Sequence, residues 1–159
     1  MFEERISVIQ RACEAWGTRE FDVFHELYTS DVVADGGSIW LETGAVHGVE
    51  AVVGNFEQII SMFERNECFP EGAFDAGDTL VVPMLWRGLT PGSEQFIEQH
   101  LIGVFGFRGT QINSLRWFAD LDEGLAAVGL SRADPIPFAK IDSPTDAEAP
   151  VADVEEPAG

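Results

Sequence analysis

Two aspartates stand at positions where a carboxylate could act in catalysis. Asp35 ends the apolar run of the stretch VVADGG, and Asp120 follows the strand-like stretch SLRWFA. A carboxyl group whose pKa is raised by burial exchanges protons near neutral pH, so both residues are candidate general acids or bases. Each also has a structural interpretation. Aspartate before Gly-Gly is a strong turn signal, and Asp120 precedes Glu123 at the spacing of a helix capping box.

Other residue types that often carry chemistry form no complete site in the sequence. Glu98 and His100 are spaced to share one face of a strand, which could begin a metal site, but two ligands do not complete one. His47 stands before a glycine and is interpreted as turn or capping chemistry. Cys13 and Cys68 have neither metal-binding nor redox spacing, so we expect two small buried hydrophobes. The phosphate-binding glycine motifs and the nucleophilic serine motif are absent, and we expect neither a metal nor a cofactor.

Length and charge restrict the classes of partner. The chain has 159 residues, 45% of them hydrophobic, which suits one domain with a sizeable core. Its formal net charge of -19 argues against nucleic acid and anionic membranes as partners, because both are bound mainly through Lys and Arg. No stretch approaches the ~20 apolar residues of a membrane span, and the N-terminus lacks the pattern of a signal peptide. We therefore expect a soluble, cytoplasmic protein.

Composition changes near residue 132. Residues 1–131 are apolar and periodic, whereas residues 132–159 form an acidic segment rich in proline and alanine. A segment of this kind buries too little apolar surface to offset its ordering entropy, so we expect a disordered tail. The exception is the stretch 136–141, which is apolar enough to dock on the domain.

The periodicity of apolar residues predicts the elements that would position these groups. Spacings of three and four residues predict helices at 6–16, 21–28 and 49–63, the first ended by Gly17. Period-two patterns predict four long strands within 67–89 and 94–120, besides the short strands VVADGG and AVHG, and a last short helix follows Asp120. Helices grouped before a strand meander predict an α+β fold in which the helices cover one face of a curved antiparallel sheet.

Several stretches in this order resemble one superfamily. FHELYTSDVVAD is similar to its second helix and first strand, and VHGVEAVVGNF to the entry of its third helix. VFGFRGTQINSLRWFADLDEGLAAVGL is similar to the closing hairpin and ending common in SnoaL-like sequences. From these stretches, roughly residues 3–131 are identified as a SnoaL-like domain of the nuclear transport factor 2 (NTF2)-like superfamily, which includes ketosteroid isomerases and polyketide cyclases. The resemblance implies a cone-shaped α+β fold, with a curved antiparallel sheet wrapped around the N-terminal helices.

The resemblance also allows a residue-by-residue comparison with ketosteroid isomerase. That enzyme needs a tyrosine, an aspartate base and a protonated aspartate, and these three positions correspond to Ala12, Gly36 and Gly103. We therefore expect that the chain is not a ketosteroid isomerase. Asp120 corresponds to the aspartate at the end of the last strand of SnoaL-like sequences, which implies an acid or base in ring closure. Asp35 lies one residue from the position of the isomerase base.

Strand parity, with the register that the resemblance implies, predicts a pocket. Alternate residues of a strand face the same side, and one set faces the helices. The predicted substrate-binding residues are Trp16, Phe56, Met84, Trp86, Gln99, Phe105 and Trp117. Such a cavity suits apolar or aromatic ligands, and Gly103 and Gly106 would leave space in it. The alternative is that the large side chains simply fill the core.

The opposite parity assigns Arg87, Glu98 and His100 to the convex face of the sheet. In this superfamily that face is often a dimer surface, so we expect a homodimer formed through it. We predict a protein that binds or converts a small hydrophobic molecule, polyketide- or steroid-like, by acid–base chemistry. The alternative is a non-catalytic dimeric module that binds a ligand or a protein, and whether the protein is an enzyme stays open.

Overall fold

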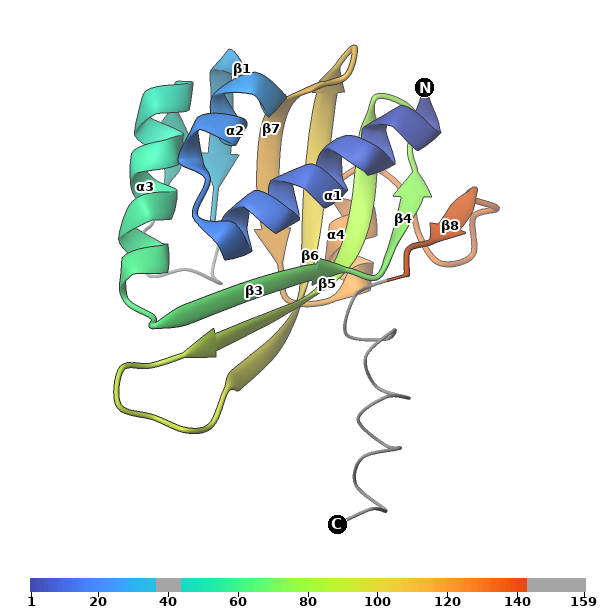
Figure 1. Ribbon diagram of the computed structural model, residues 1–159. Helices are drawn as coiled ribbons and strands as arrows, with labels where there is room; N and C mark the ends of the chain where they lie inside the picture. Colours follow the sequence, from blue (N-terminus) through green and yellow to red (C-terminus); the bar gives the residue numbers. More distant parts are fainter. Residues whose placement is uncertain (37–43, 143–159) are drawn as a thin grey trace, which may run out of the picture.

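The computed structural model describes residues 1–36 and 44–142, which form four helices and eight strands (Figure 1). The helices are α1 (Phe2–Thr18), α2 (Phe21–Leu27), α3 (Val49–Ser61) and α4 (Leu121–Ala126). The strands are β1 (Tyr28–Asp35), β2 (Ala45–His47), β3 (Arg65–Pro70), β4 (Gly72–Asp75), β5 (Thr79–Leu89), β6 (Ile97–Arg108), β7 (Gln111–Phe118) and β8 (Phe138–Lys140). They form one sheet in the order β2-β1-β7-β6-β5-β4-β8, and β3 also pairs with β5. All neighbours are antiparallel except β1 and β7.

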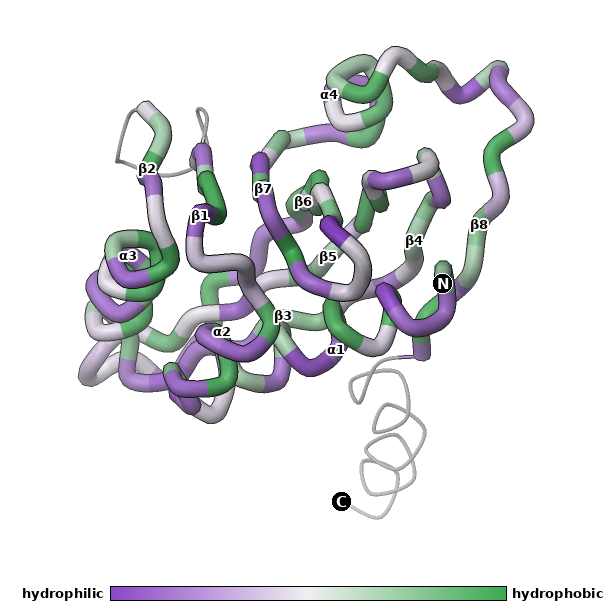
Figure 2. Tube along the Cα trace, turned by 90° about the horizontal axis from the view of Figure 1, so that it is seen from above, coloured by the Kyte–Doolittle hydropathy of each residue, from purple (hydrophilic) through white to green (hydrophobic). Residues whose placement is uncertain are grey.

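The sheet separates two apolar layers. Helices α1, α2 and α3 lie on one side of it and α4 on the other (Figure 2). The larger core packs the apolar faces of the N-terminal helices against β1, β5, β6 and β7. A smaller core lies under α4 and consists of Val81, Ile102, Val104 and Leu125. The predicted α+β class is confirmed, with the N-terminal helices packed against a curved sheet.

The prediction that Gly17 ends the first helix is wrong. Helix α1 continues to Thr18, and Arg19 adopts the left-handed conformation at φ 63° and ψ 32°. The Arg19 guanidinium donates hydrogen bonds to the carbonyls of Phe63 and Glu64 at 2.8 and 3.2 Å, which compensate for the unfavourable backbone. Gly17 has a packing role instead, because a Cβ there would lie 3.3 Å from the Asn66 carbonyl oxygen on β3.

A buried arginine ties α1 to two turns. Arg5 is only 8% exposed, and its Nε and Nη1 donate to the carbonyls of Gly109 and Gly77, each at 2.9 Å. Its guanidinium also lies over the Phe107 ring, 5.3 Å from the centroid. The start of α1 is therefore held against the β4–β5 and β6–β7 turns by charge-assisted hydrogen bonds.

The segment expected to dock on the domain does so. Strand β8 pairs with β4, the rings of Phe74 and Phe138 lie 4.6 Å apart, and Ile141 joins the main core at 4% exposure. The ordered chain thus continues past residue 131, and the predicted tail residues 143–159 lie outside the described part. Within that part, no helix combines the length and apolar character needed to cross a lipid bilayer.

Candidate functional site

A small apolar cavity lies between the N-terminal helices and the sheet. Its volume is about 30 Å³, which leaves room for about two water molecules. The cavity, called the inner cavity below, is lined by Ala12, Cys13, Trp16, Phe24, Tyr28, Phe56, Cys68, Met84, Trp86, Leu101, Phe105, Leu115 and Trp117. None of the described residues in its wall carries a carboxylate, so these residues offer an uncharged environment to a ligand.

Phe56 of α3 is the centre of the aromatic wall. Its ring lies 5.2 Å from the rings of Trp16 and Phe24 and 6.0 Å from that of Tyr28, each in an edge-to-face arrangement. The apolar stripe of α3 turns Phe56 inward, and α1, α2 and β1 bring the other three rings to it. Edge-to-face contacts add to the burial energy of aromatic rings, so this side of the cavity is firmly packed.

The predicted binding residues divide into two groups. Trp16, Phe56, Met84, Trp86, Phe105 and Trp117 line the inner cavity. Gln99 is instead exposed and absent from the lining. Strand β7 pairs with β6 only from Ile102 onward, so residues 97–101 of β6 form a sheet edge within the projecting β5–β6 hairpin (Figure 1).

The polar groups of the inner cavity come from residues without a sequence signal for binding. Tyr28 is 3% exposed, and burial raises the pKa of its hydroxyl far above the usual value. The Cys68 thiol, through a side-chain hydrogen bond, and burial together raise the pKa of Cys13. Tyr28 and Cys13 therefore stay protonated and neutral near pH 7, where the hydroxyl and the thiol can donate hydrogen bonds.

A larger hollow lies outside the cavity, between the second half of α1 and strand β3. Its volume is about 640 Å³, and it is called the outer groove below. The outer groove is lined by Gln10, Cys13, Glu14, Gly17, Thr18, Arg19, Glu64, Arg65, Asn66, Glu67, Cys68, Phe69, Pro70, Ile141 and Asp142. Of the residues that the structure describes, only Cys13 and Cys68 line both hollows, so these two side chains lie between the groove and the cavity.

Asp35 lies beside a third hollow of about 20 Å³ but does not line it. Ala34 and Gly36, its neighbours in sequence, face that hollow, and strand alternation turns Asp35 to the other side of β1. Asp35 is half-buried and stands opposite Arg116 of β7 in the parallel register. The bulge that could reverse its direction would involve residue 37, which lies outside the described residues.

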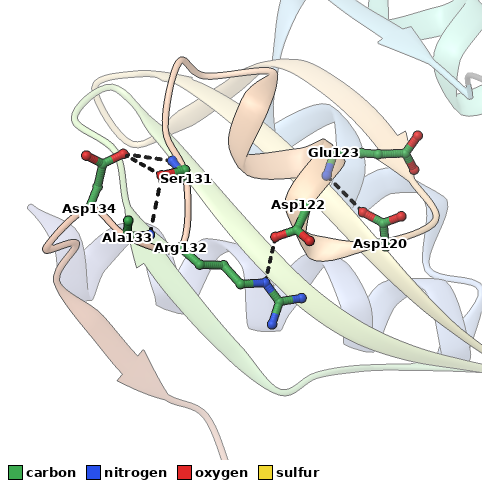
Figure 3. Close-up of polar contacts among 7 residues, drawn as sticks. All are labelled: Asp120, Asp122, Glu123, Ser131, Arg132, Ala133 and Asp134. Carbon is green, nitrogen blue, oxygen red and sulfur yellow. Dashed lines mark hydrogen bonds and ion pairs between the residues drawn. The ribbon is translucent and has the colours of Figure 1, made fainter.

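Asp120 is exposed and caps α4, as the capping-box spacing predicts. Its Oδ1 accepts a hydrogen bond from the backbone N–H of Glu123 at 2.9 Å (Figure 3). On the same helix, Asp122 forms an ion pair with Arg132 at 2.6 Å (Figure 3). Asp120 thus secures the helix on the convex side of the sheet and lines none of the three hollows.

The remaining polar candidates lie on the outer face of the sheet. Arg87 donates to Glu67 at 3.1 Å, lies 2.9 Å from Glu98, and stacks on Phe96 with its Cζ 4.0 Å from the ring centroid. Together these contacts form a ladder across β3, β5 and β6. His100 faces Glu71 at 3.5 Å and His47 is exposed on β2. Among the described residues no three His, Cys, Asp or Glu side chains converge as metal ligands do.

The glycines expected to leave space in the sheet do not. A Cβ on Gly103 would lie 2.6 Å from the Phe105 ring and 3.3 Å from the Met84 sulfur. A Cβ on Gly106 would collide with the Ser114 side chain. Neighbouring side chains therefore fold over both glycines, and no carboxylate fits at position 103 without displacing Phe105.

The order of helices and strands, and the apolar cavity under them, define an NTF2-like fold. The family model of the SnoaL-like domain matches residues 9–115 of the chain. The chain therefore belongs to the SnoaL-like domain family.

Solved structures agree with this assignment. A protein with a ketosteroid isomerase-like fold from Catenulispora acidiphila DSM 44928, in complex with trimethylamine, aligns at a TM-score of 0.63 and 20% identity over 77% of this chain and 92% of its own. A candidate SnoaL-like polyketide cyclase from Jannaschia sp. CCS1 aligns at a TM-score of 0.64 and 22% identity, over 84% of this chain and 94% of its own. TerC, co-crystallised with polyporic acid, aligns at a TM-score of 0.64 and 12% identity, over 74% of this chain and 92% of its own. At these identities the likeness shows the fold alone. No curated protein matches the sequence.

Proposed function

We propose that the protein binds a small apolar molecule in the inner cavity. The observation that carries this proposal is the apolar, aromatic lining, which includes Trp16, Phe56 and Trp117 and, among the described residues, no carboxylate. Few polar groups in an apolar wall are typical of sites for hydrophobic ligands. The structures in complex with trimethylamine and co-crystallised with polyporic acid support the proposal, because both pair a small molecule with a similar fold.

The cavity is narrow in this conformation and must widen to hold a ligand. Its 30 Å³ is far below the ~300–1,000 Å³ of typical ligand sites. Met84 has a flexible thioether side chain, and Trp117 is only half-buried at the margin. Rotation of these two side chains would enlarge the space next to Phe105, which lines the same cavity.

Binding is favoured over acid–base conversion by the positions of the two acids. Asp120 caps α4 on the convex side, and Asp35 faces away from the hollow beside it. A general acid or base must come within hydrogen-bond reach of the reacting group. Conversion would therefore need β1 to change register and turn Asp35 inward, whereas binding needs only side-chain rotation.

The experiment is a titration with the neutral fluorescent dye 1-N-phenylnaphthylamine. We expect the dye to bind with enhanced emission, and Ala12→Leu to weaken binding about tenfold or more, because three added carbons fill the cavity. Ala126→Leu on the exposed face of α4 is the matched control and should bind like the wild type. Circular dichroism checks that both variants fold. Equal binding by all three proteins would show that the dye does not enter the cavity.

We further propose a homodimer formed through the part of the convex face that α4 leaves open. Leu85 is half-buried there beside the Glu67–Arg87–Glu98 ladder, and an apolar centre with ordered charges suits an interface. Sedimentation velocity should show a dimer for the wild type and a monomer for Leu85→Glu. A monomeric wild-type protein at micromolar concentration would refute the dimer.

We also propose that the protein works in the cytoplasm. Cys13 and Cys68 line the same two hollows as free thiols, which fits a reducing compartment. Fractionation of the native cells followed by immunoblotting tests the location. Recovery outside the cytoplasmic fraction would refute it.

A further inference from the structure

The chain folds so that two distant cysteines meet. Gly17 on α1 lies close to the Asn66 carbonyl of β3, and Cys13 precedes Gly17 by one helical turn. Cys68 follows Asn66 by two residues on the strand. Residues four apart on a helix share a face, as do residues two apart on a strand, so the same line of contact brings Cys13 to Cys68. Their presence in the walls of both the outer groove and the inner cavity agrees with this placement.

The two thiols differ in access. Cys13 is buried at 7% exposure, whereas Cys68 is half-buried and borders the outer groove. The side-chain hydrogen bond between Cys13 and Cys68, together with burial, raises the pKa of Cys13, so Cys13 stays a thiol near pH 7. A reagent that enters the groove therefore meets Cys68 first, with Cys13 directly behind it.

We propose that Cys13 and Cys68 form a thiol–disulfide exchange site whose co-reactant is a small neutral disulfide, and that the bond formed closes the passage between the outer groove and the inner cavity. The Cys68 thiolate attacks one sulfur of the co-reactant and releases the first small thiolate, which leaves a mixed disulfide. Cys13 loses its proton to water and attacks the Cys68 sulfur, which releases the second small thiolate. Two protein thiols are oxidised, one small disulfide is reduced to two thiols, and the protons end on the released thiolates.

The charge of the groove selects a neutral co-reactant. Its charged lining residues are Glu14, Arg19, Glu64, Arg65, Glu67 and Asp142. The acids outnumber the arginines by four to two, and the whole chain carries a net charge of -19. An anionic disulfide is repelled by this field, whereas a neutral one is not.

The disulfide between Cys13 and Cys68 would also restrict the route from the outer groove to the inner cavity. A disulfide between α1 and β3 holds the two elements at one separation, at the point where the groove adjoins the cavity. A ligand coming from the groove then cannot part the two side chains. This effect on binding rests on the proposed ligand cavity, whereas formation of the disulfide does not.

The experiment treats the full-length reduced protein with bis(2-hydroxyethyl) disulfide, followed by intact mass measurement and peptide mapping. We expect the wild type to lose two hydrogen atoms, about 2 Da, and to yield one peptide pair joined through Cys13 and Cys68. Cys13→Ala should stop at the mixed disulfide on Cys68, and Cys68→Ala should react at least about tenfold more slowly, because Cys13 is buried. The doubly anionic glutathione disulfide should react more slowly than the neutral reagent with the wild type.

Stopped-flow binding of 1-N-phenylnaphthylamine gives the second measurement. We expect the association rate to fall about tenfold or more in the oxidised wild type and to recover with dithiothreitol. Cys68→Ala, given the same treatment, serves as the control, since it can form neither the internal bond nor a mixed disulfide at position 68, and its association rate should be the same before and after treatment.

Three outcomes would overturn parts of the proposal, each at a different point. A wild type whose thiols stay free, or stay as mixed disulfides in the native protein, refutes the exchange site. A disulfide that forms without slowing dye entry refutes the closure. If the reduced protein binds no dye, the proposed ligand cavity fails, and the mass measurement still decides the exchange site by itself.

Discussion

Replacing Asn66 with leucine tests the buried hydrogen bonds that hold the wall of the inner cavity. Asn66 is 3% exposed, its Nδ2 donates to the Ile60 carbonyl at 3.0 Å, and its Oδ1 accepts from Trp86 Nε1 at 3.0 Å. Leucine has a similar size but neither donor nor acceptor. The Ile60 carbonyl keeps a hydrogen bond from the N–H of Phe63, so losing the Asn66 donor costs less at Ile60 than losing the Asn66 acceptor costs at Trp86. At ~1–3 kcal/mol for each weakened buried group, we expect a destabilisation of about 2–3 kcal/mol.

Urea unfolding followed by circular dichroism measures this change. With a slope of ~1–3 kcal/mol/M, the midpoint should fall by about 1 M. Trp86→Phe removes the donor but keeps an aromatic ring, and the double variant completes a thermodynamic cycle. We expect the Asn66 and Trp86 substitutions to be coupled by about 1 kcal/mol. A loss of less than about 0.5 kcal/mol, or additive effects, would show that the network does not hold the wall.

Three further predictions concern charged groups. Arg5→Met should lower the free energy of unfolding by about 3 kcal/mol, because the buried Arg5 side chain loses two charge-assisted hydrogen bonds to the carbonyls of Gly77 and Gly109. Urea unfolding measures this, and a loss as small as that of a surface substitution would contradict it. The pKa of Asp31 is lowered mainly by its hydrogen bonds to Arg108. The ion pair therefore stabilises the fold fully above the usual Asp pKa of about 3.9, and this stabilisation is lost as the pH falls through the lowered pKa. NMR titration should show this pKa rising in Arg108→Gln, and an unchanged value would contradict the assignment. Asp120→Ala should cost about 1 kcal/mol through the lost cap and leave dye binding unchanged, whereas weaker binding would argue for a role at the cavity.

Local patterns in the sequence were sufficient for the helices, most strands and the cap of α4. The apolar stripes that predict α1 and α3 work because a helix repeats every 3.6 residues, whatever it packs against. The capping role of Asp120 depends on a partner only three residues away. Strand parity was enough to place Met84 and Phe105 in the cavity wall, since alternation is a property of the strand itself.

Features that depend on where one element meets another needed the tertiary structure. Gln99 has the parity of an inward residue, yet it is exposed because β7 ends before reaching it. Gly103 looks like free space in the sequence, but the ring of Phe105 lies over it. The hydrogen bonds of Arg5 reach turns more than 70 positions away, which no local pattern reports.

The sequence by itself determined an α+β SnoaL-like domain with an apolar, aromatic interior and an acidic surface, because periodicity and composition act locally or on the whole chain. Only the tertiary structure decided how much of that interior stays open and what separates it from solvent. Cys13 and Cys68 show the reason most clearly: their spacing is that of two unrelated thiols. The close approach of α1 to β3 at Gly17 makes them neighbours between the groove and the cavity.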